Sequence, residues 1–340
     1  MVYQRKPLRD PSVSVVLPYF NAEDTLGAAI DSIQAQTFEY WELILFDDGS
    51  SDTSVRIAED RAARDPRIRL LSSSHVGIVA ALQKACGEIR GNLIARMDAD
   101  DIAYPQRLAR QLEVMAKYPV TALCGTCVRM IGPGIGYGRR RYERWINELV
   151  THDAIVRELF VECPIPHPTF MITRKAFETV GGYQDHGWAE DYDLCLRVFT
   201  AGLRFAKAPE ILLDWRDSPQ RLSMTDERYA PSRFRNLKRH YLFQTYLKDH
   251  DVFYQWGAGE VGKRWLREWG RHTPAAVADI NPRKIGHSIH GVPVIAPEDL
   301  PRPGNGYILI AVGASDAHQD IRDRLIPRGY RELEHFLFLA

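Results

Sequence analysis

The chain has 340 residues, of which 45% are hydrophobic, and this favours a sizeable core and two domains over one. Lys plus Arg and Asp plus Glu each number 44, and this balance predicts no nucleic-acid partner. Segment 1–11 lacks the apolar stretch of a signal peptide, and no run approaches the ~20 apolar residues of a membrane-spanning helix. We therefore expect a cytoplasmic protein. Contact with the inner face of the membrane and homo-oligomer formation stay open.

The five cysteines are too few and too scattered for a disulfide framework, which fits a reducing compartment. Cys124 and Cys127 have C-x-x-C spacing, but the chain has no second pair to complete a zinc site. They fall in the apolar run 120–131, so we interpret them as small core residues of a strand.

Residues 12–130 alternate short apolar runs with segments of helical periodicity. Strands are expected at 12–17, 41–46, 67–71, 93–97 and 120–131, and helices at 23–36, from 51, at 77–86 and at 105–118. This alternation predicts an α/β fold with a mostly parallel, doubly wound sheet. Ligands of such sheets bind beyond the carboxyl ends of the strands.

The next hundred or so residues have a weaker pattern. Residues 131–168 are expected to be irregular apart from a helix near 152–161. The arginine run 139–141, with Arg144, then belongs to a solvated loop or meets lipid phosphates. Further elements are expected as a strand at 170–173, a turn at 181–183, a helix at 190–201, a strand at 211–215 and an amphipathic helix at 229–247. That last helix packs on its own domain or lies on a membrane.

A second α/β pattern begins at Val252. Strands are expected at 252–256, 275–279, 307–312 and 335–339, and helices at 263–271 and 315–326. We therefore predict a first domain at 1–224, a linking helix at 225–250 and a small Rossmann-like domain at 251–340.

Two carboxylates, Asp98 and Asp100, follow the strand predicted at 93–97. Alternating carboxylates at a strand end can bind one Mg²⁺ or Mn²⁺, which prefers oxygen ligands and shares its shell with substrate phosphates. The alternative is an acidic cluster that stabilises a helix N-terminus, with Asp101 as the cap of the helix that starts at Pro105.

Four segments resemble, in order, the motifs of family 2 glycosyltransferases of the GT-A fold. They are VSVVLPYFN at 13–21, LFDDGSSDT at 45–53, ARMDADD at 95–101 and EDYDL at 190–194. The resemblance covers residues 12–223. It implies an inverting single displacement from a nucleotide-sugar donor, usually UDP-linked, with Mg²⁺ or Mn²⁺ as cofactor. The acceptor is a hydroxyl of a glycan, a lipid-linked sugar or a small molecule.

The resemblance also implies residue roles on the donor side. The donor nucleotide is expected at Pro18, Tyr19, Asn21, Glu23, Asp48, Arg96 and Asp98. In the family pattern Tyr19 lies near the nucleobase of the donor, and Asp48 accepts a hydrogen bond from that nucleobase. Asp47 is expected to be structural. Asp100 is the direct metal ligand, and Asp98 contacts metal and ribose.

On the acceptor side, an inverting transfer needs one base for the attacking hydroxyl. The family pattern assigns this role to Asp191, with Glu190 as the orienting residue. The alternative is an acidic first turn of a helix. His167 contacts acceptor or diphosphate, or is structural.

The loop 215–221 departs from the family pattern, since it lacks the His that many relatives place there. That His is a further metal or diphosphate contact, and Arg216, Asp217 or Arg221 is its expected replacement, while the third metal ligand stays undetermined. The chain also lacks the Gln-x-x-Arg-Trp motif of processive synthases, which favours addition of one sugar per encounter.

In the C-terminal segment, Gly257, Gly259 and Gly262 follow a predicted strand with the spacing of a dinucleotide-binding turn, and Asp279 ends the next strand. We keep three interpretations open: a nucleotide or sugar-nucleotide pocket, a docking module that has lost its ligand, and a redox site.

Two other functions are alternatives for the whole chain. A sugar nucleotidyltransferase needs a Gly-rich basic loop after the first strand, and Pro18–Asn21 is not one. A non-catalytic binding or scaffold protein is expected to have lost the aspartates of the site. This chain has Asp98, Asp100 and Asp191, which argues against that alternative.

Overall fold

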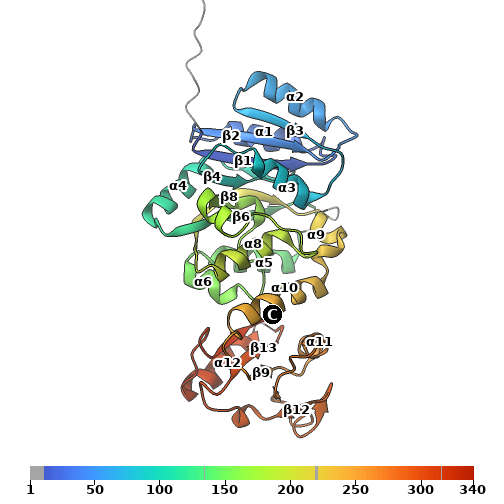
Figure 1. Ribbon diagram of the computed structural model, residues 1–340, viewed down its shortest axis with the longest axis vertical. Coiled ribbons are helices and arrows are strands. Elements are labelled where there is room, and N and C mark those ends of the chain that lie inside the picture. Colours follow the sequence, from blue (N-terminus) through green and yellow to red (C-terminus); the bar gives the residue numbers. More distant parts are fainter. Residues whose placement is uncertain (1–10, 134, 219–220, 315) are drawn as a thin grey trace, which may run out of the picture. The chain divides into compact units, whose positions relative to one another are not determined.

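The computed structural model describes residues 11–133, 135–218, 221–314 and 316–340. The chain divides into two compact units, each with its own sheet (Figure 1). The first contains the described residues of Met1–Ile155 and Pro164–Thr225. The second contains Val156–Cys163 and Asp226–Ala340, so the helix expected at 229–247 belongs to it.

The first unit is built on an eight-stranded sheet with the order β3-β2-β1-β4-β7-β6-β8-β5. The strands are β1 (Val13–Tyr19), β2 (Trp41–Asp47), β3 (Ile68–Ser72), β4 (Leu93–Arg96), β5 (Ile102–Ala103), β6 (Thr121–Ile131), β7 (Met171–Thr173) and β8 (Arg204–Arg216). Strands β3, β2, β1 and β4 are parallel, whereas β7 is antiparallel to both β4 and β6. The α/β class is confirmed, and the parallel part of the sheet is the part that carries the strand ends of interest.

The sequence of the parallel strands explains their position. Every residue of β1 and β2 is buried, and both are near-continuous apolar runs, as expected for strands covered on both faces. Leu26, Ile30 and Ile33 form one buried face of α1, with the spacing of helical turns. Cys124 and Cys127 are buried free cysteines in β6, consistent with a core role.

The helices of the first unit are α1 (Leu26–Gln34), α2 (Ser54–Arg64), α3 (Ile78–Gly87), α4 (Arg107–Lys117), α5 (Tyr137–Glu148), α6 (His152–Glu158), α7 (Arg174–Thr179), α8 (Glu190–Thr200) and α9 (Leu222–Thr225), with a short 3-10 helix at His167–Thr169. The expectation of an irregular segment from 131 was wrong over α5. Arg139 pairs with Asp217 at 3.1 Å, and Ile146 is fully buried, so tertiary contacts support a helix that the neighbouring glycines obscured.

The second unit has a six-stranded sheet with the order β11-β12-β10-β9-β13-β14. Its strands are β9 (Phe253–Trp256), β10 (Val277–Ala278), β11 (Ser288–Ile289), β12 (Val292–Ile295), β13 (Tyr307–Ile310) and β14 (Phe336–Phe338), and its main helices are α10 (Pro231–Gln244), α11 (Glu260–Glu268) and α12 (Asp316–Leu325). All strand pairs are parallel except β11 with β12. The sequence pattern missed β11, which has two residues, and β12, whose apolar run is interrupted by Pro293.

No helix in the described part of the chain is long and apolar enough to cross a membrane.

Candidate active site

Three aspartates cluster directly after β4. Asp98, Asp100 and Asp101 each offer a carboxylate oxygen, and these oxygens lie within 4.8 Å of one another. Asp98 and Asp100 are partly exposed, whereas Asp101 is fully buried. The cluster therefore has an open side toward solvent and a closed side in the protein.

The cluster carries more negative charge than its own contacts neutralise. Burial, and then the charge of Asp98, raise the pKa of Asp100 to about 6. The same two effects raise the pKa of Asp101 well above its usual range. The Oδ2 atom of Asp101 is buried without a hydrogen-bond partner. A divalent cation that prefers oxygen ligands fits this donor set, because it satisfies the orphaned oxygen and offsets the repulsion.

Asp101 does not cap a helix, so that alternative was wrong. Helix α4 begins at Arg107 with Gln106 at its N-cap, and the cap makes no side-chain hydrogen bond. The Asp101 Oδ1 instead accepts from the backbone N–H of Arg216 at 2.7 Å, and the Arg216 Nε donates to the Asp100 carbonyl at 2.8 Å. These two hydrogen bonds join the segment 98–101 to the end of β8. The sequence pattern could not predict this contact, because the two segments are more than a hundred residues apart in the chain.

Another residue proposed for this loop, Arg221, lies above the Trp215 ring at 4.6 Å and pairs with Asp217 at 3.5 Å. Its positive charge acts on Asp100 and Asp101, where it opposes the effect of burial on their pKa values. Both arginines of the loop are therefore close to the acidic cluster.

The neighbouring strand ends carry the expected donor-side residues. Pro18 and Tyr19 are buried at the end of β1, and Asp48 is buried just after β2. The two Asp48 carboxylate oxygens accept from the backbone N–H groups of Val76 and Gly77 at 2.7 and 3.0 Å. The His75 Nδ1 also lies 3.0 Å from the Asp48 Oδ2, so Asp48 holds the segment that leads into α3 (Ile78–Gly87).

Asn21 and Glu23 brace the loop after β2. The Asn21 Oδ1 accepts from the Ser51 N–H at 2.8 Å, and the Glu23 Oε2 accepts from the Thr53 N–H at 3.0 Å. Asp47 accepts from the Ser50 N–H at 3.0 Å, in line with a structural role. These contacts connect the two loops that lie beside Asp48.

Glu190 and Asp191 form the first turn of α8. Glu190 is 2% exposed, whereas Asp191 is partly exposed and its Oδ1 accepts from the Tyr192 N–H at 2.7 Å. Arg96 is buried with its Nη2 2.5 Å from the Asp98 Oδ1, and its charge acts on both Asp98 and Glu190. The positive charge of Arg96 therefore acts both on the acidic cluster and on the first turn of α8.

His167 lies beside Glu190, away from solvent. Its Nε2 is 2.7 Å from the Tyr183 hydroxyl, and its Nδ1 is 3.7 Å from the Glu190 Oε1. Burial, and then the charge of Arg96, lower the pKa of His167 well below its usual range. The ring is therefore neutral and buried against Glu190, which favours the structural alternative for this histidine.

With this geometry in view, comparison with known proteins assigns the family. A model described as Glycosyl transferase family 2 matches residues 14–181. The putative glycosyltransferase EpsE of Bacillus subtilis (strain 168) is 33% identical over 212 residues, which cover 61% of this chain and 73% of that protein. The chain belongs to glycosyltransferase family 2.

Two further proteins extend the comparison. The amylovoran biosynthesis glycosyltransferase AmsE of Erwinia amylovora is 27% identical over 203 residues, covering 59% of this glycosyltransferase and 74% of AmsE. Residues 1–349 of S. aureus TarS, solved in complex with UDP-GlcNAc, match with a TM-score of 0.55 at 14% identity, covering 77% of this chain and 72% of that one. The GT-A fold expected from the sequence is confirmed.

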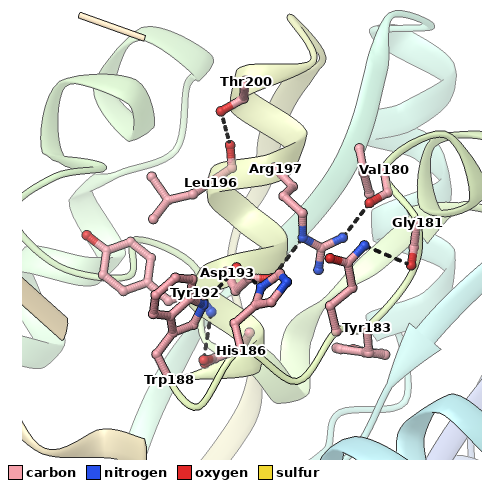
Figure 2. A network of polar contacts seen from close by, with 12 residues as sticks. Val180, Gly181, Tyr183, His186, Trp188, Tyr192, Asp193, Leu196, Arg197 and Thr200 are labelled. Atoms are coloured by element: carbon pink, nitrogen blue, oxygen red, sulfur yellow. Dashed lines mark hydrogen bonds and ion pairs between the residues drawn. The ribbon is translucent and has the colours of Figure 1, made fainter. Parts of the chain in front are cut away.

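The family model matches this glycosyltransferase only up to residue 181, before α8 begins. The surroundings of Glu190 are therefore described from the structure alone. Asp193 is fully buried and accepts from the Trp188 Nε1 at 2.9 Å and the Arg197 Nε at 2.8 Å (Figure 2). No site role was predicted from the sequence for Asp193, Trp188 or Tyr183. The available signal was the spacing of Asp193 and Arg197, four residues apart on one helix face.

The glycine turn of the glycosyltransferase's second unit is largely accounted for by local packing. A Cβ on Gly262 would lie 1.8 Å from the Gly257 carbonyl oxygen, and Gly257 itself has a φ of 109°. Asp279 accepts from the Ala258 N–H at 2.8 Å and pairs with Lys284 at 3.1 Å. Gly259 differs, because nothing lies within 4 Å of an added Cβ.

Proposed function

We propose that this glycosyltransferase moves a sugar from a nucleoside-diphosphate donor to an acceptor hydroxyl, with inversion at the anomeric carbon. The observation that carries the proposal is the undercompensated cluster of Asp98, Asp100 and Asp101 at the carboxyl edge of the sheet. The charge of Arg96 acts on both this cluster and Glu190 in the first turn of α8, and the next residue, Asp191, is partly exposed. A UDP-sugar is the first donor to test.

The acidic cluster is the proposed site of Mg²⁺ or Mn²⁺. Asp100 and Asp98 would be ligands, and Asp101, with its unpartnered Oδ2, is the candidate for the third carboxylate. The bound ion would supply positive charge to the diphosphate leaving group. Arg216 and Arg221 add positive charge on the same side.

Asp191 is the proposed general base. It would take the proton of the acceptor hydroxyl as that oxygen bonds to the anomeric carbon. The bond from the anomeric carbon to the diphosphate breaks in the same step, and the diphosphate leaves with its electron pair. Glu190, 2% exposed and beside His167, would hold the first turn of α8 in place.

The acceptor class is proposed from the relatives and from the sequence. AmsE is named for amylovoran biosynthesis, and this supports a role in polysaccharide or surface-glycan assembly for the present chain. A glycan or a lipid-linked sugar is then the expected acceptor, with a small molecule as the alternative.

The second unit is proposed to bind a nucleotide or a sugar nucleotide. The support is Gly259, which lies at the N-cap of α11 with open space in front of it. Titration of UDP, UDP-GlcNAc and NAD⁺ into a Gly259→Val variant and the wild type separates this proposal from a docking module without a ligand.

The direct test of the donor site is thermal stability with UDP, with Mn²⁺, and with both together. Mn²⁺ is expected to increase stabilisation by UDP in the wild type, and Asp100→Ala is expected to abolish this increase. Asp60→Asn is the matched control, because Asp60 is an exposed carboxylate of α2. If Mn²⁺ adds nothing to UDP stabilisation in the wild type, the metal-dependent donor site is wrong.

A further inference from the structure

A buried carboxylate on α8 holds a pair of aromatic rings. Asp193 is 0% exposed, and it binds the Trp188 indole N–H at 2.9 Å, the Arg197 Nε at 2.8 Å and the His186 Nδ1 at 3.4 Å (Figure 2). Arg197 compensates the carboxylate charge. A buried charge pair is weak evidence for stability, so a role beyond stability is worth testing for this one.

The network fastens the loop before α8 to the helix. The Arg197 Nη1 donates to the Val180 carbonyl at 2.5 Å, at the start of the loop, and Trp188 is tied at its end. Between them, Gly187 has a φ of 73° and donates its N–H to the Asp185 Oδ1 at 3.1 Å. The loop is therefore fixed at both ends and in its turn.

Two aromatic side chains of the Asp193 network, those of His186 and Trp188, reach the surface. His186 is exposed and Trp188 is partly exposed, with ring centroids 5.4 Å apart and planes at 60°. Because the indole N–H is bound to Asp193, the ring orientation is set before any ligand arrives. Trp188 lies three positions before Asp191, in the segment that leads into the first turn of α8.

We propose that Trp188, with His186, is the platform on which the sugar ring of the acceptor stacks, and that Asp193 is its positioning residue. Sugar rings present C–H faces that pack on aromatic rings, and one acceptor hydroxyl must come within hydrogen-bond reach of the base. The donor is assigned to Asp48 and the acidic cluster, so the α8 side is left to the acceptor. The inference rests on the proposed function, since it takes Asp191 as the base.

The test compares donor hydrolysis with the response to acceptor probes. Wild-type protein is assayed with Mn²⁺ and UDP-glucose or UDP-N-acetylglucosamine, with and without the p-nitrophenyl β-glycosides of glucose, galactose and N-acetylglucosamine. Trp188→Ala is expected to raise the half-saturating probe concentration about tenfold or more and to leave donor hydrolysis within about twofold. Trp188→Phe keeps a ring without the N–H and is expected to fall in between.

Two further variants separate positioning from a general structural role. Asp193→Asn is expected to weaken the probe response selectively, as Trp188→Phe does. Thr200→Val removes a hydrogen bond to the Leu196 carbonyl at the other end of the same helix, and it is expected to change neither readout.

The outcomes are distinct. If the wild type hydrolyses no donor, the proposed function fails first. If donor is hydrolysed and the wild type and Trp188→Ala respond alike to every probe, including no response by either, the platform is wrong. A parallel fall in donor hydrolysis and melting temperature in Trp188→Phe also overturns it, because the tether would then be purely structural.

Discussion

Each of the two units of this glycosyltransferase has an aspartate close after a parallel strand, yet the surroundings of the two aspartates differ. After β4, Asp101 has an unpartnered oxygen and a raised pKa. After β10, Asp279 is buried to a similar degree, but its oxygens accept from Ala258, Asn281 and Lys284. A position at a strand end therefore does not by itself make a site. The number of donors already bound to the carboxylate decides whether it can hold a cation.

The largest expected effect concerns the base that acts beside the first cluster. Asp191→Asn keeps the size of the side chain and removes its basicity, so transfer is expected to fall by roughly 10²–10⁴-fold. UDP and Mn²⁺ binding, measured by thermal shift, are expected to persist because the acidic cluster is unchanged. Transfer at the wild-type rate would remove Asp191 from the mechanism.

The pH dependence of stability tests whether burial and repulsion between the carboxylates (together called crowding below) destabilise the cluster of Asp98, Asp100 and Asp101. The pKa of Asp100 rises from 3.8 to about 6 on folding, so the folded metal-free protein holds more protons than the unfolded chain between these values. Its free energy of unfolding is therefore expected to fall as pH rises from about 4 to 6, and Mn²⁺ at pH 7 should restore it. Thermal melts of the wild type and Asp100→Asn check this. The variant's profile should be flatter, and identical profiles contradict the crowding.

Matched amide substitutions sharpen the contrast between the two strand ends. Asp101→Asn keeps the acceptor for the Arg216 N–H and lets the new amide donate to neighbouring carboxylates, so metal-free stability at pH 7 should hold or rise. Asp279→Asn removes the charge that pairs with Lys284, and we expect a loss of about 1–2 kcal/mol. Denaturant unfolding of both variants measures the difference. Equal destabilisation by the two substitutions would contradict the proposed difference between Asp101 and Asp279.

The smallest effects are expected in the glycine turn of the second unit. Gly259→Ala adds a methyl group into open space at a φ of −80°, so stability should change by no more than about 0.5 kcal/mol. Gly262→Ala drives the same methyl group into the Gly257 carbonyl and should destabilise strongly. Melting temperatures give the ranking, and the reverse order would refute the packing explanation of the motif.

Much of the fold followed from local pattern, because β1 and β2 are continuous apolar runs and α1 has helical spacing. Helix α5 did not, since its glycine-rich approach hides contacts such as Arg139 with Asp217, made across a long stretch of chain. The family resemblance assigned the donor-side residues, and the parallel order of β2, β1 and β4 puts the ends of these strands side by side. The roles of the donor-side residues remain predictions, as do the metal ligands and the base.

The sequence by itself determined the fold family, the order of the motifs and the presence of aspartates after β4, because residue type and periodicity are local properties. Only the tertiary structure decided what each carboxylate does. Asp101 is hydrogen-bonded to the end of β8 and not to α4, and His167 is buried against Glu190. Asp193 accepts a hydrogen bond from the Trp188 indole. Hydrogen-bond partners and burial depend on elements distant in the chain, and these two quantities set the charge that a carboxylate can carry.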